Sequence, residues 1–464
     1  MLNSKFLALR ESYNATPYPS YRDRKKILLK IKKSLVENEI NIYQALKDDY
    51  GYRSEFDTFI AELLPSIMGV NYAIKNLKKW MKPSKRRAGI MIFPSSVAVH
   101  YQPLGVVGIV VPWNLPFFLA LAPAVQALAA GNRVMIKMSE FTPHANQTLR
   151  KVLKDVVDHI VIIEGESGVG AEFSALPFDH LMFTGSTSVG RHIARAAADN
   201  LTPITLELGG KSPVIVDKHA DINATVDSII LGKSCNAGQI CVAPDYILIH
   251  SREKEKFIKK FICNYRKYFC NDNNNNRQTH IINDRHFKRL NDLIEDANSK
   301  GAQIHAVMDY DNVKGERVLY PHLLTNVSED MNVMKEEVFG SIIPVLSYDT
   351  IDEAIEFINK RPHPLAIYLM SRNRKIIDKV LKTTHSGGMC VNDTAIHALA
   401  DDSPFGGVGH SGMGHYRGQE GFETFSKAKT VLTTKPWVPK NAFLVQHRDF
   451  VLKILRIFFV RYSE

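Results

Sequence analysis

Residues 104–130 read LGVVGIVVPWNLPFFLALAPAVQALAA, an apolar stretch that decides the fold. Its first part, residues 104–111, is a continuous apolar run rich in valine, which is typical of a strand buried on both faces of a sheet. Its last part, residues 117–130, is rich in alanine and leucine and is followed by Gly131, as expected of a buried helix and its end. The stretch therefore predicts a strand–helix unit of a parallel α/β sheet.

The same alternation of strand and helix patterns continues after this stretch. A second set of alternating elements starts at Pro213 and runs to about Asn392, so the chain predicts two doubly wound parallel-sheet domains of the α/β class. Residues 1–85 carry helical periodicity, and residues 86–103 alternate like a β-hairpin. In the first set the predicted strands are 104–111, 133–137, 160–163, 180–183 and 203–206, and the predicted helices are 117–130, 143–157 and 189–200. The pattern of the last helix places Val189 on its apolar face.

Length and composition limit the class of protein. A chain of 464 residues is too long for one ordinary core, and 45% hydrophobic with 23% charged residues is typical of a globular enzyme. Five cysteines without a C-x-x-C pair argue against a disulfide framework and against a zinc ribbon. Residues 1–24 lack the apolar core of a secretion signal, and no apolar run reaches the ~20 residues of a membrane span. We therefore expect a cytoplasmic protein without a metal centre.

The net charge of +11 raises the question of a polyanionic partner. Its densest clusters lie at residues 22–33 and 75–87. In the first cluster the lysines lie outside a set of helically spaced apolar residues, which indicates a solvated helix face. No zinc pattern and no RNA-binding motif accompanies the charge, so we expect no nucleic-acid partner. The helically spaced residues are Ile27, Leu28, Ile31 and Leu35.

A cysteine and a glutamate suggest chemistry. Cys241 in NAGQICVAP (residues 236–244) follows a small Gly-Gln turn, which suits a thiol presented at a cleft; the alternative is a buried, inert cysteine. Glu207 in LELGGKSP (residues 206–213) lies in an apolar, glycine-flanked setting, where desolvation would raise its pKa toward that of a useful base. The two residues form a candidate pair of nucleophile and base.

The stretch FTGSTSVG (residues 183–190) follows a strand and opens a helix, the place where backbone N–H groups bind a pyrophosphate; a tight turn without a ligand is the alternative. Dinucleotide sites place an acid ~20 residues beyond the glycines. Glu207 lies 22 residues after Gly185 (207 − 185), so it competes for this role with the base role. Lys137 and Glu140, at the end of another strand, provide a second candidate, and spacing leaves both open.

Asn114 lies in PWNLPF (residues 112–117), at the carboxyl end of the first buried strand. Open α/β sheets bind ligands at this edge. An asparagine amide held between two prolines suits a donor to an oxyanion, and an Asx turn is the structural alternative.

Taken in order, these motifs resemble the aldehyde dehydrogenase superfamily along nearly the whole chain. The closing segment, residues 404–416, looks like the class 3 branch and is most similar to bacterial coniferyl aldehyde dehydrogenases. Met138 and Ser341 stand where proline is common in the family, and neither change removes a reacting group. The motifs are PWNLPF, KMSE, FTGSTSVG, LELGGKSP, GQIC, EEVFG and PFGGVGHSGMG.

The resemblance implies a role for each candidate residue. Cys241 would be the nucleophile, Glu207 the general base and Asn114 the oxyanion donor. The cofactor would be NAD, because Glu140 favours a free 2′-hydroxyl, with NADP as the second candidate. The implied cofactor-binding residues are Lys137 and Glu140 at the adenine ribose, Gly185, Ser186 and Gly190 at the pyrophosphate, and Glu337 and Phe339 at the nicotinamide ribose.

The implied reaction is oxidation of an aldehyde to its carboxylic acid through a cysteine thiohemiacetal and thioester. The aldehyde could be aromatic, such as coniferyl aldehyde, or medium- to long-chain aliphatic. A cofactor-independent thiol hydrolase or acyltransferase on the same scaffold is the alternative. The implied division is a dinucleotide-binding domain (1–85 and 104–208), a catalytic domain (209–403) and a bridging element (86–103 and 425–437).

The remaining segment, 438–464, is an apolar and basic C-terminal tail. Charged residues interrupt its apolar run, which fits an amphipathic helix that lies on a membrane surface or docks on a partner subunit. The bridging element implies a homodimer. We therefore expect a homodimeric protein whose tail provides peripheral membrane contact or subunit contact.

Overall fold

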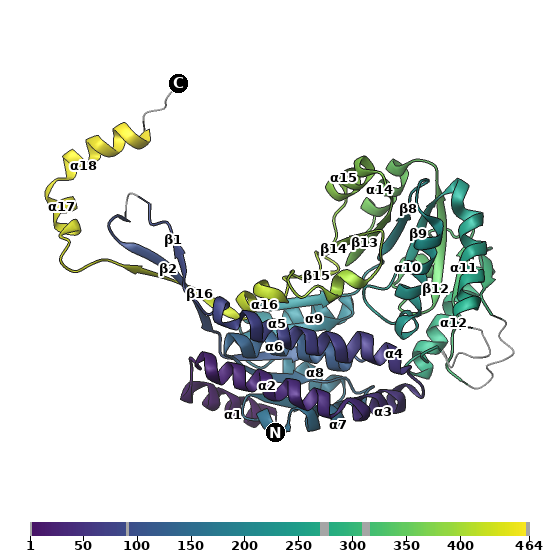
Figure 1. Cartoon of the computed structure of the whole chain (residues 1–464), viewed down its shortest axis with the longest axis horizontal. Coiled ribbons are helices and arrows are strands. Elements are labelled where there is room, and N and C mark those ends of the chain that lie inside the picture. Colours follow the sequence, from purple (N-terminus) through teal and green to yellow (C-terminus); the bar gives the residue numbers. More distant parts are fainter. Residues whose placement is uncertain (1, 90–91, 270–277, 309–315, 461–464) are drawn as a thin grey trace.

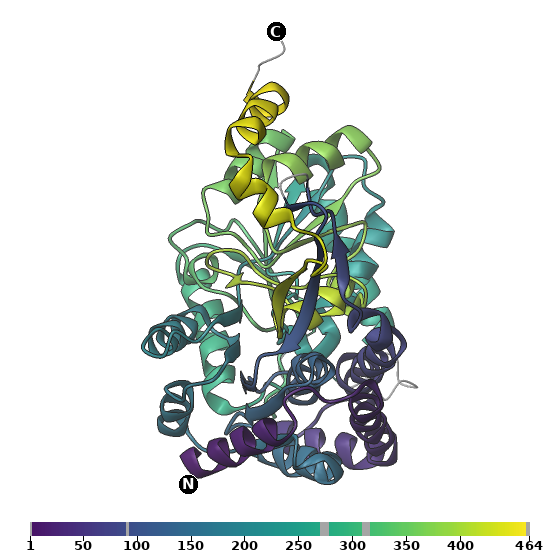
Figure 2. The same cartoon turned by 90° about the vertical axis from the view of Figure 1, so that its left-hand side faces the viewer.

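The computed structural model of the chain describes residues 2–89, 92–269, 278–308 and 316–460. Parts of the predicted hairpin, of the predicted catalytic domain and of the predicted tail (90–91, 270–277, 309–315 and 461–464) lie outside the described residues. The described chain forms two α/β bodies and an arm that projects from the first body (Figure 1). In both views the C-terminal helices lie toward the top and the N-terminal helix lies toward the bottom (Figures 1 and 2).

The first body contains a six-stranded sheet in the order β15-β7-β6-β3-β4-β5. All its neighbouring strands are parallel except the pair β15–β7, which is antiparallel. β15 (Gly412–Met413) joins the sheet from near the C-terminus, outside the segments predicted for this domain. The other strands are β3 (Val106–Val110), β4 (Arg133–Lys137), β5 (Ile160–Ile163), β6 (His180–Gly185) and β7 (Ile204–Leu208).

The apolar stretch at residues 104–130 forms β3 and α6 (Pro116–Ala130), as predicted. Helix α6 is buried almost all round, which explains its nearly continuous apolar sequence. Gly131 ends it in the left-handed region, with φ of 100°. A Cβ at Gly131 would lie 2.8 Å from atoms of Arg24 and Pro103, so both the backbone angle and the space require glycine.

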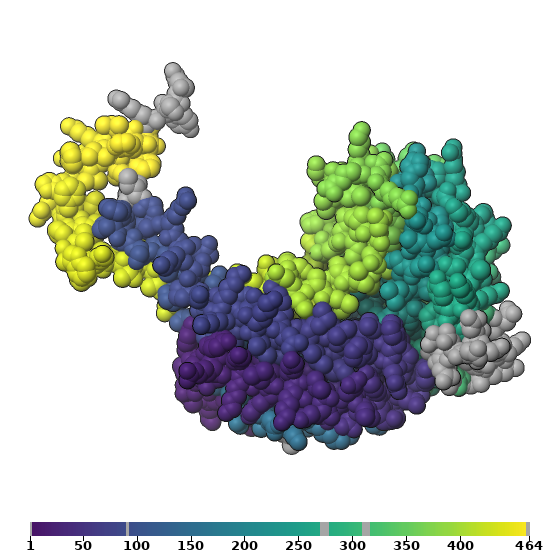
Figure 3. All heavy atoms as spheres, viewed as in Figure 1, coloured from purple at the N-terminus to yellow at the C-terminus, as the bar shows by residue number. Residues whose placement is uncertain are grey.

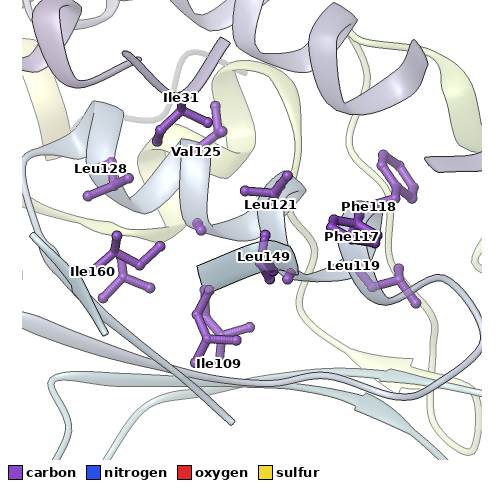
Figure 4. Packing of buried hydrophobic residues seen from close by; sticks show 14 of the residues in the cluster. Ile31, Ile109, Phe117, Phe118, Leu119, Leu121, Val125, Leu128, Leu149 and Ile160 are labelled. Carbon is purple, nitrogen blue, oxygen red and sulfur yellow. The ribbon is translucent and has the colours of Figure 1, made fainter. Parts of the chain in front are cut away.

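Helices cover both faces of this sheet. On one face, apolar side chains of α2 and α6 meet strand residues such as Ile109 and Ile160 (Figure 4). On the other face, Phe6 of α1 and Ile193 of α9 belong to a second cluster with strand residues. The helices of this body are α1 (Leu2–Ala15), α2 (Tyr21–Glu37), α3 (Glu39–Tyr50), α4 (Glu55–Thr58), a π-helix (Phe59–Leu63), α5 (Leu64–Trp80), α6, α7 (Pro143–Val152), α8 (Ser167–Ser174), α9 (Thr187–Ala198) and α16 (Gly418–Thr424).

The second body contains a seven-stranded sheet in the order β10-β11-β12-β9-β8-β13-β14, parallel except for β10–β11. Two apolar clusters fill its two faces. Its strands are β8 (Pro213–Val216), β9 (Tyr246–His250), β10 (Gln303–Ala306), β11 (His322–Thr325), β12 (Ile342–Tyr348), β13 (Ala366–Met370) and β14 (Gly388–Val391). Its helices are α10 (Ile222–Ser234), α11 (Lys254–Phe269), α12 (Asp284–Ser299), α13 (Asn332–Lys335), α14 (Ile351–Asn359) and α15 (Arg374–Thr383).

The arm consists of a three-stranded antiparallel sheet and the C-terminal helices. β2 (Ser96–Pro103) lies between β1 (Ser84–Arg86) and β16 (Ser426–Thr433). Helices α17 (Lys440–Gln446) and α18 (Arg448–Leu455) and a π-helix (Arg456–Val460) follow, and they contain no buried residue. The space-filling view shows the arm standing clear of the second body (Figure 3). Among the described residues, no helix is long and apolar enough to cross a membrane.

The structure differs from the predicted elements at several boundaries. The helix predicted at 143–157 ends at Val152, and a short 3-10 turn at Lys154–Val156 follows. Val189, predicted on the apolar face of α9, is 46% exposed, because it lies in the first turn of the helix and lines the cavity described below. Helix α8 was not predicted, because its glycine-rich sequence carries little periodicity. The four apolar residues predicted for α2 are buried.

Candidate active site

A cavity of about 620 Å³ lies between the two bodies. It opens at the carboxyl ends of β3, β4, β6 and β7, the edge where open α/β sheets bind ligands. Of the ten residues predicted for the site, nine line this cavity, and Gly190 does not. The nine are Asn114, Lys137, Glu140, Gly185, Ser186, Glu207, Cys241, Glu337 and Phe339.

Cys241 follows a tight turn at the end of α10. Asn236, Ala237 and Gly238 take up left-handed φ values of 50°, 53° and 72° in succession. A Cβ at Gly238 would lie 2.7 Å from the carbonyl oxygen of Gly340, so the turn also brings two loops close together. This turn presents Cys241, which is partly exposed, to the cavity.

The surroundings of Cys241 oppose thiolate formation. Burial, followed by the nearby carboxyl groups of Glu337 and Glu207, raises the pKa of the thiol to about 12. Hydrogen bonds from the backbone N–H groups of Cys241 and Val242 lower the pKa of the thiol and so partly oppose this rise. The thiol is therefore protonated near neutral pH, and a positive charge brought into the cavity would favour the thiolate.

Glu207 is buried in β7, opposite Thr184 of β6 and Gly412 of β15. It is 3% exposed, and neither carboxyl oxygen makes a hydrogen bond within the described part of the chain. Burial raises its pKa well above the ordinary value, and Arg417 opposes this shift. A buried carboxyl group with raised pKa and free lone pairs can accept a proton from a small molecule in the cavity.

Asn114 lies in the loop between β3 and α6 and is 2% exposed. Its Nδ2 donates to the carbonyl oxygen of Gln239 at 3.1 Å. Gln239 lies two residues before Cys241, so the amide of Asn114 is tied directly to the loop of the thiol. The arrangement brings an amide donor, a thiol and a carboxyl group from three separate segments to one cavity.

The cofactor-binding candidates of the first body lie at strand ends. Lys137 ends β4, and its Nζ donates to the carbonyl oxygen of Met138 at 2.8 Å and lies 4.0 Å from the Glu140 carboxylate. Burial lowers the pKa of Lys137. Ser186 is the N-cap of α9 and accepts a hydrogen bond from the N–H of Val189 at 3.4 Å. A cation, a carboxylate and a helix N-terminus thus share one wall of the cavity.

Gly190 and Cys235 are not among the residues that line the cavity. A Cβ at Gly190 would lie 2.6 Å from Leu208, so this glycine allows α9 to approach β7 closely. Its predicted contact with a cofactor has no counterpart in the cavity lining. Cys235 packs against the main core of the first body, and burial raises its pKa well above the usual value.

Glu337 and Phe339 come from the loop between α13 and β12. Burial, with Asp245 adding to it, raises the pKa of Glu337 to about 8. A Cβ at Gly209 would collide with the Glu337 carboxylate, so only glycine leaves room for it. Phe339 has a left-handed φ of 48° and packs edge-on against Trp113, with ring centroids 5.4 Å apart.

The two departures from the family pattern are both buried. Met138 packs in the core of the first body. Ser341 donates from Oγ to the carbonyl oxygen of Ala237 at 3.0 Å and accepts from Gln278 at 2.7 Å. Proline could not make these bonds, so the serine adds a link between the Glu337 loop and the Cys241 loop.

Sequence reasoning missed one group of lining residues on the first turns of α12. The ring of His286 lies tilted against that of Trp113, with ring centroids 5.0 Å apart, and burial with two nearby arginines lowers the pKa of His286 to about 4. Arg289 donates to the carbonyl oxygens of Glu337 and Val338. Arg285 is exposed at the cavity. The only signal in this segment was Asn283 before an amphipathic helix, which predicts a helix start and no chemistry.

Comparisons with known proteins agree with one another. The sequence pattern described as "Aldehyde dehydrogenase family" matches residues 9–431. A probable coniferyl aldehyde dehydrogenase of Pseudomonas aeruginosa is 45% identical over 99% of this chain and 96% of its own length. The dimeric NADP-preferring aldehyde dehydrogenase of Rattus norvegicus is 37% identical over 91% of this chain and 92% of its own.

A solved structure shares the fold. The substrate-bound structure of Staphylococcus aureus AldH superposes with a TM-score of 0.90, covers 97% of this chain and 99% of its own, and is 34% identical. The predicted α/β architecture of two parallel-sheet bodies is therefore confirmed.

Proposed function

Because the chain belongs to the aldehyde dehydrogenase family, and so carries out NAD(P)-dependent oxidation of an aldehyde, we propose that Cys241, Glu207 and Asn114 perform this reaction. The observation that carries the proposal is that these three residues line one cavity with Lys137 and Glu337. A nucleophile, a base and an oxyanion donor are thus next to groups that suit a dinucleotide.

The first step is addition of Cys241 to the aldehyde. After the thiol proton passes to solvent, the thiolate sulfur bonds to the carbonyl carbon, and the carbonyl oxygen takes up the negative charge. The side-chain amide of Asn114 and the backbone N–H of Cys241 hold this oxyanion. The Asn114 amide suits the task because it is buried and already tied to the Cys241 loop.

The polar side chains that line the cavity suit the binding of a dinucleotide. Lys137 and Glu140 suit ribose hydroxyls, Ser186 opens a helix beside the place for phosphates, and Glu337 suits the second ribose. A bound oxidised nicotinamide supplies a hydride acceptor and a positive charge in the cavity. The chain's own contribution is to hold the thiohemiacetal oxyanion at Asn114, so that collapse of the oxyanion expels hydride and leaves a thioester on Cys241.

The last step is hydrolysis of the thioester. The ionised Glu207 takes a proton from a water molecule, and the water oxygen bonds to the thioester carbon. The carbon–sulfur bond then breaks to release the carboxylic acid and the Cys241 thiolate, and the proton on Glu207 returns to the sulfur to restore the thiol. The buried carboxyl group of Glu207 has no hydrogen-bond donor from the described residues to compete with that water. Burial raises its pKa, which makes the ionised carboxylate a stronger acceptor for this proton.

Two substitutions test these roles. Cys241→Ala should abolish aldehyde-dependent nucleotide reduction, and Glu207→Gln should leave one rapid turnover and then stall. Mass spectrometry of the stalled Glu207→Gln protein should show the acyl group on Cys241. Steady turnover by either variant at the rate of the native enzyme would contradict the assignment.

A cofactor-independent thiol hydrolase or acyltransferase is not favoured. That function would leave the half-buried Glu337 and the lysine–glutamate pair at Lys137 and Glu140 without a role. Nucleotide binding, measured by calorimetry with NAD and with NADP, distinguishes the two functions. Absence of binding by the folded protein would favour the hydrolase.

We propose coniferyl-type aromatic aldehydes as the substrate class, since the Pseudomonas relative carries that name. Medium- and long-chain aliphatic aldehydes are the alternative substrate class, and they are compared with coniferyl aldehyde in the same assay. The ratio kcat/KM should be higher for coniferyl aldehyde than for octanal or dodecanal. The reverse order would assign the aliphatic class.

We propose NAD as the preferred cofactor. A 2′-phosphate would meet the negative charge of Glu140, while NADP stays the second candidate because the rat relative is named NADP-preferring. The ratio of kcat/KM for the two nucleotides measures this preference directly.

We also propose the division predicted from the sequence, with the first body binding the dinucleotide, the second carrying the thiol, and the arm joining two copies of the chain in a homodimer. The arm's exposed position and the name of the dimeric rat relative support the last part. Light scattering of the full chain should give twice the monomer mass, and a monomer would contradict the dimer.

Peripheral membrane contact through the tail stays a prediction, as does the cytoplasmic location. The tail exposes apolar side chains beside Arg448, Lys453 and Arg456, as expected of a helix at a lipid surface. The full chain should sediment with anionic liposomes more than a chain that ends at residue 440. Equal sedimentation would contradict membrane contact.

A further inference from the structure

Behind the Asn114 loop lies a buried charged pair that the proposed reaction does not use. Arg53 and Glu62 have fully buried side chains, and Arg53 Nη1 lies 3.3 Å from Glu62 Oε1. Both residues come from the N-terminal helical region, Arg53 just before α4 and Glu62 within the π-helix Phe59–Leu63. Burial of two charges is costly, and π-helical turns often mark functional sites, so this pair needs an explanation.

The pair is directed at the main chain of Asn114. Arg53 Nη1 donates to the carbonyl oxygen of Asn114 at 3.2 Å. The Nε and Nη2 groups of Arg53 find no acceptor among the described residues, so Nη1 carries the directional contacts. Glu62 accepts from the N–H of Phe118 at 2.9 Å, which fixes the pair to the first turn of α6.

Two more donors converge on the same carbonyl oxygen. The hydroxyl of Tyr50 donates to it at 3.1 Å, and Nδ2 of Asn236 donates to it at 3.1 Å. Asn236 belongs to the left-handed turn before Cys241, and its own N–H donates to Asp57 at 3.0 Å. One carbonyl oxygen therefore joins the N-terminal helices, the Asn114 loop and the Cys241 loop.

We infer that Arg53, held by Glu62, is a positioning residue that fixes the backbone of Asn114 and thereby aims the Asn114 side-chain amide at the oxyanion. The inference rests on the proposed role of Asn114. Arg53 would act only through Asn114, because its own contacts are to the Asn114 carbonyl oxygen, Glu62 and the ring of Tyr50, rather than to the cavity.

The test is a double-mutant cycle read in the first turnover. Arg53→Lys keeps the positive charge but loses the planar guanidinium group with its several N–H donors. It should slow the first-turnover formation of reduced nucleotide by about tenfold. This effect is smaller than that expected from the loss of a whole oxyanion donor. The Kd of the nucleotide should not change. In an Asn114→Ala background, Arg53→Lys should change the first-turnover rate by less than about twofold, because coupled groups are not additive.

Arg24→Lys is the matched control. Arg24 is 1% exposed and donates to the backbone carbonyl oxygens of Pro19, Ala129 and Ala130, away from the cavity. It should lower the melting temperature and leave the first-turnover rate unchanged. If Arg53→Lys does not fold, Tyr50→Phe removes one donor from the same carbonyl oxygen and should show a smaller slowing with the same dependence on Asn114.

The outcomes separate the inference from the proposed function. An equal slowing by Arg53→Lys in the native and Asn114→Ala backgrounds, or no slowing in an active enzyme, would overturn the inference alone. A native enzyme without aldehyde-dependent nucleotide reduction would overturn the proposed function before the cycle begins.

Discussion

The two sides of the cavity are built in different ways. On the first body, Lys137 and Glu207 are strand residues, so the hydrogen bonds of the sheet fix their backbone. On the second body, Cys241, Glu337 and Phe339 lie on irregular loops. Contacts between residues far apart in sequence fix those loops, such as Ser341 to Ala237 and Asp245 to the N–H of Val338.

This difference indicates where the site is most sensitive to substitution. A strand-end group keeps its place unless the sheet fails, so changes nearby should affect stability first. A loop group depends on a few hydrogen bonds and on left-handed residues, so a small change there should affect catalysis before stability. Four predictions test this contrast, in order of decreasing effect.

The largest effect is expected at the turn before Cys241. Gly238→Ala places a Cβ at a φ of 72° and 2.7 Å from the carbonyl oxygen of Gly340. The strain, of order 1–3 kcal/mol, should move the loop and lower kcat by up to about 100-fold. Gly131→Ala is the control, since it creates similar strain at the end of α6, far from the cavity.

Gly131→Ala should lower the melting temperature by a similar amount and leave kcat within about twofold of the native value. Steady-state kinetics and thermal unfolding of the two variants provide the comparison. Equal losses of kcat would show that the loop is no more sensitive than the sheet.

The second prediction concerns the pH dependence of thioester hydrolysis. Glu207 must be ionised to accept a proton, and burial raises its pKa, so thioester hydrolysis should rise about tenfold per pH unit below that pKa and then level off. In Glu207→Gln this limb should disappear, because a glutamine amide cannot take up a proton from water as a carboxylate does. A pH–rate profile of the deacylation step that is the same in both proteins would contradict the base role.

The raised pKa of Glu207 also determines how the free energy of unfolding changes with pH. The folded state holds the Glu207 proton more tightly than the unfolded state, so the contribution of Glu207 to the free energy of unfolding falls as pH rises from about 4.5 toward the raised pKa. Glu207→Gln should therefore be less destabilised by rising pH than the native protein. Urea unfolding at several pH values measures this slope.

The third effect concerns the link between the two loops. Ser341→Ala removes the hydrogen bond to the carbonyl oxygen of Ala237, worth about 1 kcal/mol, and should lower kcat by about fivefold. Ser371→Ala is the control, because Ser371 is equally buried in the second body and bonds to Asp217 instead. Equal kcat values for the two variants would argue against the link.

The smallest effect concerns cofactor choice. Glu140→Gln removes the negative charge at an exposed position of the cavity, and screening by solvent limits the gain. The NADP-to-NAD ratio of kcat/KM should rise by about threefold. Glu164→Gln, at another exposed carboxylate that pairs with Arg150, should leave the ratio unchanged. An unchanged ratio in Glu140→Gln would remove this residue from the cofactor site.

The same contrast explains what the sequence could predict. Apolar periodicity predicted β3, α6 and the parallel sheets, because burial on both faces leaves a continuous pattern. Motif order predicted the residues that line the cavity, Gly190 excepted. Periodicity could not reveal His286 and Arg289, because α12 is an ordinary amphipathic helix whose meeting with the cavity depends on how the two bodies pack.

Long-range polar contacts were equally hidden. Nothing in the local sequence of Arg53 or Glu62 distinguishes them from surface charges of an amphipathic helix. Their burial depends on the packing of the N-terminal helical region against the Asn114 loop, more than 50 residues away along the chain. Tertiary structure alone converts this charged pair into a support for the cavity.

The most direct test of the proposed reaction is the near-ultraviolet absorbance of reduced nicotinamide. The native protein and Cys241→Ala are each mixed with NAD or NADP and with coniferyl aldehyde or an aliphatic aldehyde. We predict that absorbance rises only when the aldehyde, the nucleotide and Cys241 are all present. An equal rise in Cys241→Ala, or no rise from folded native protein that binds the nucleotide, would contradict the account.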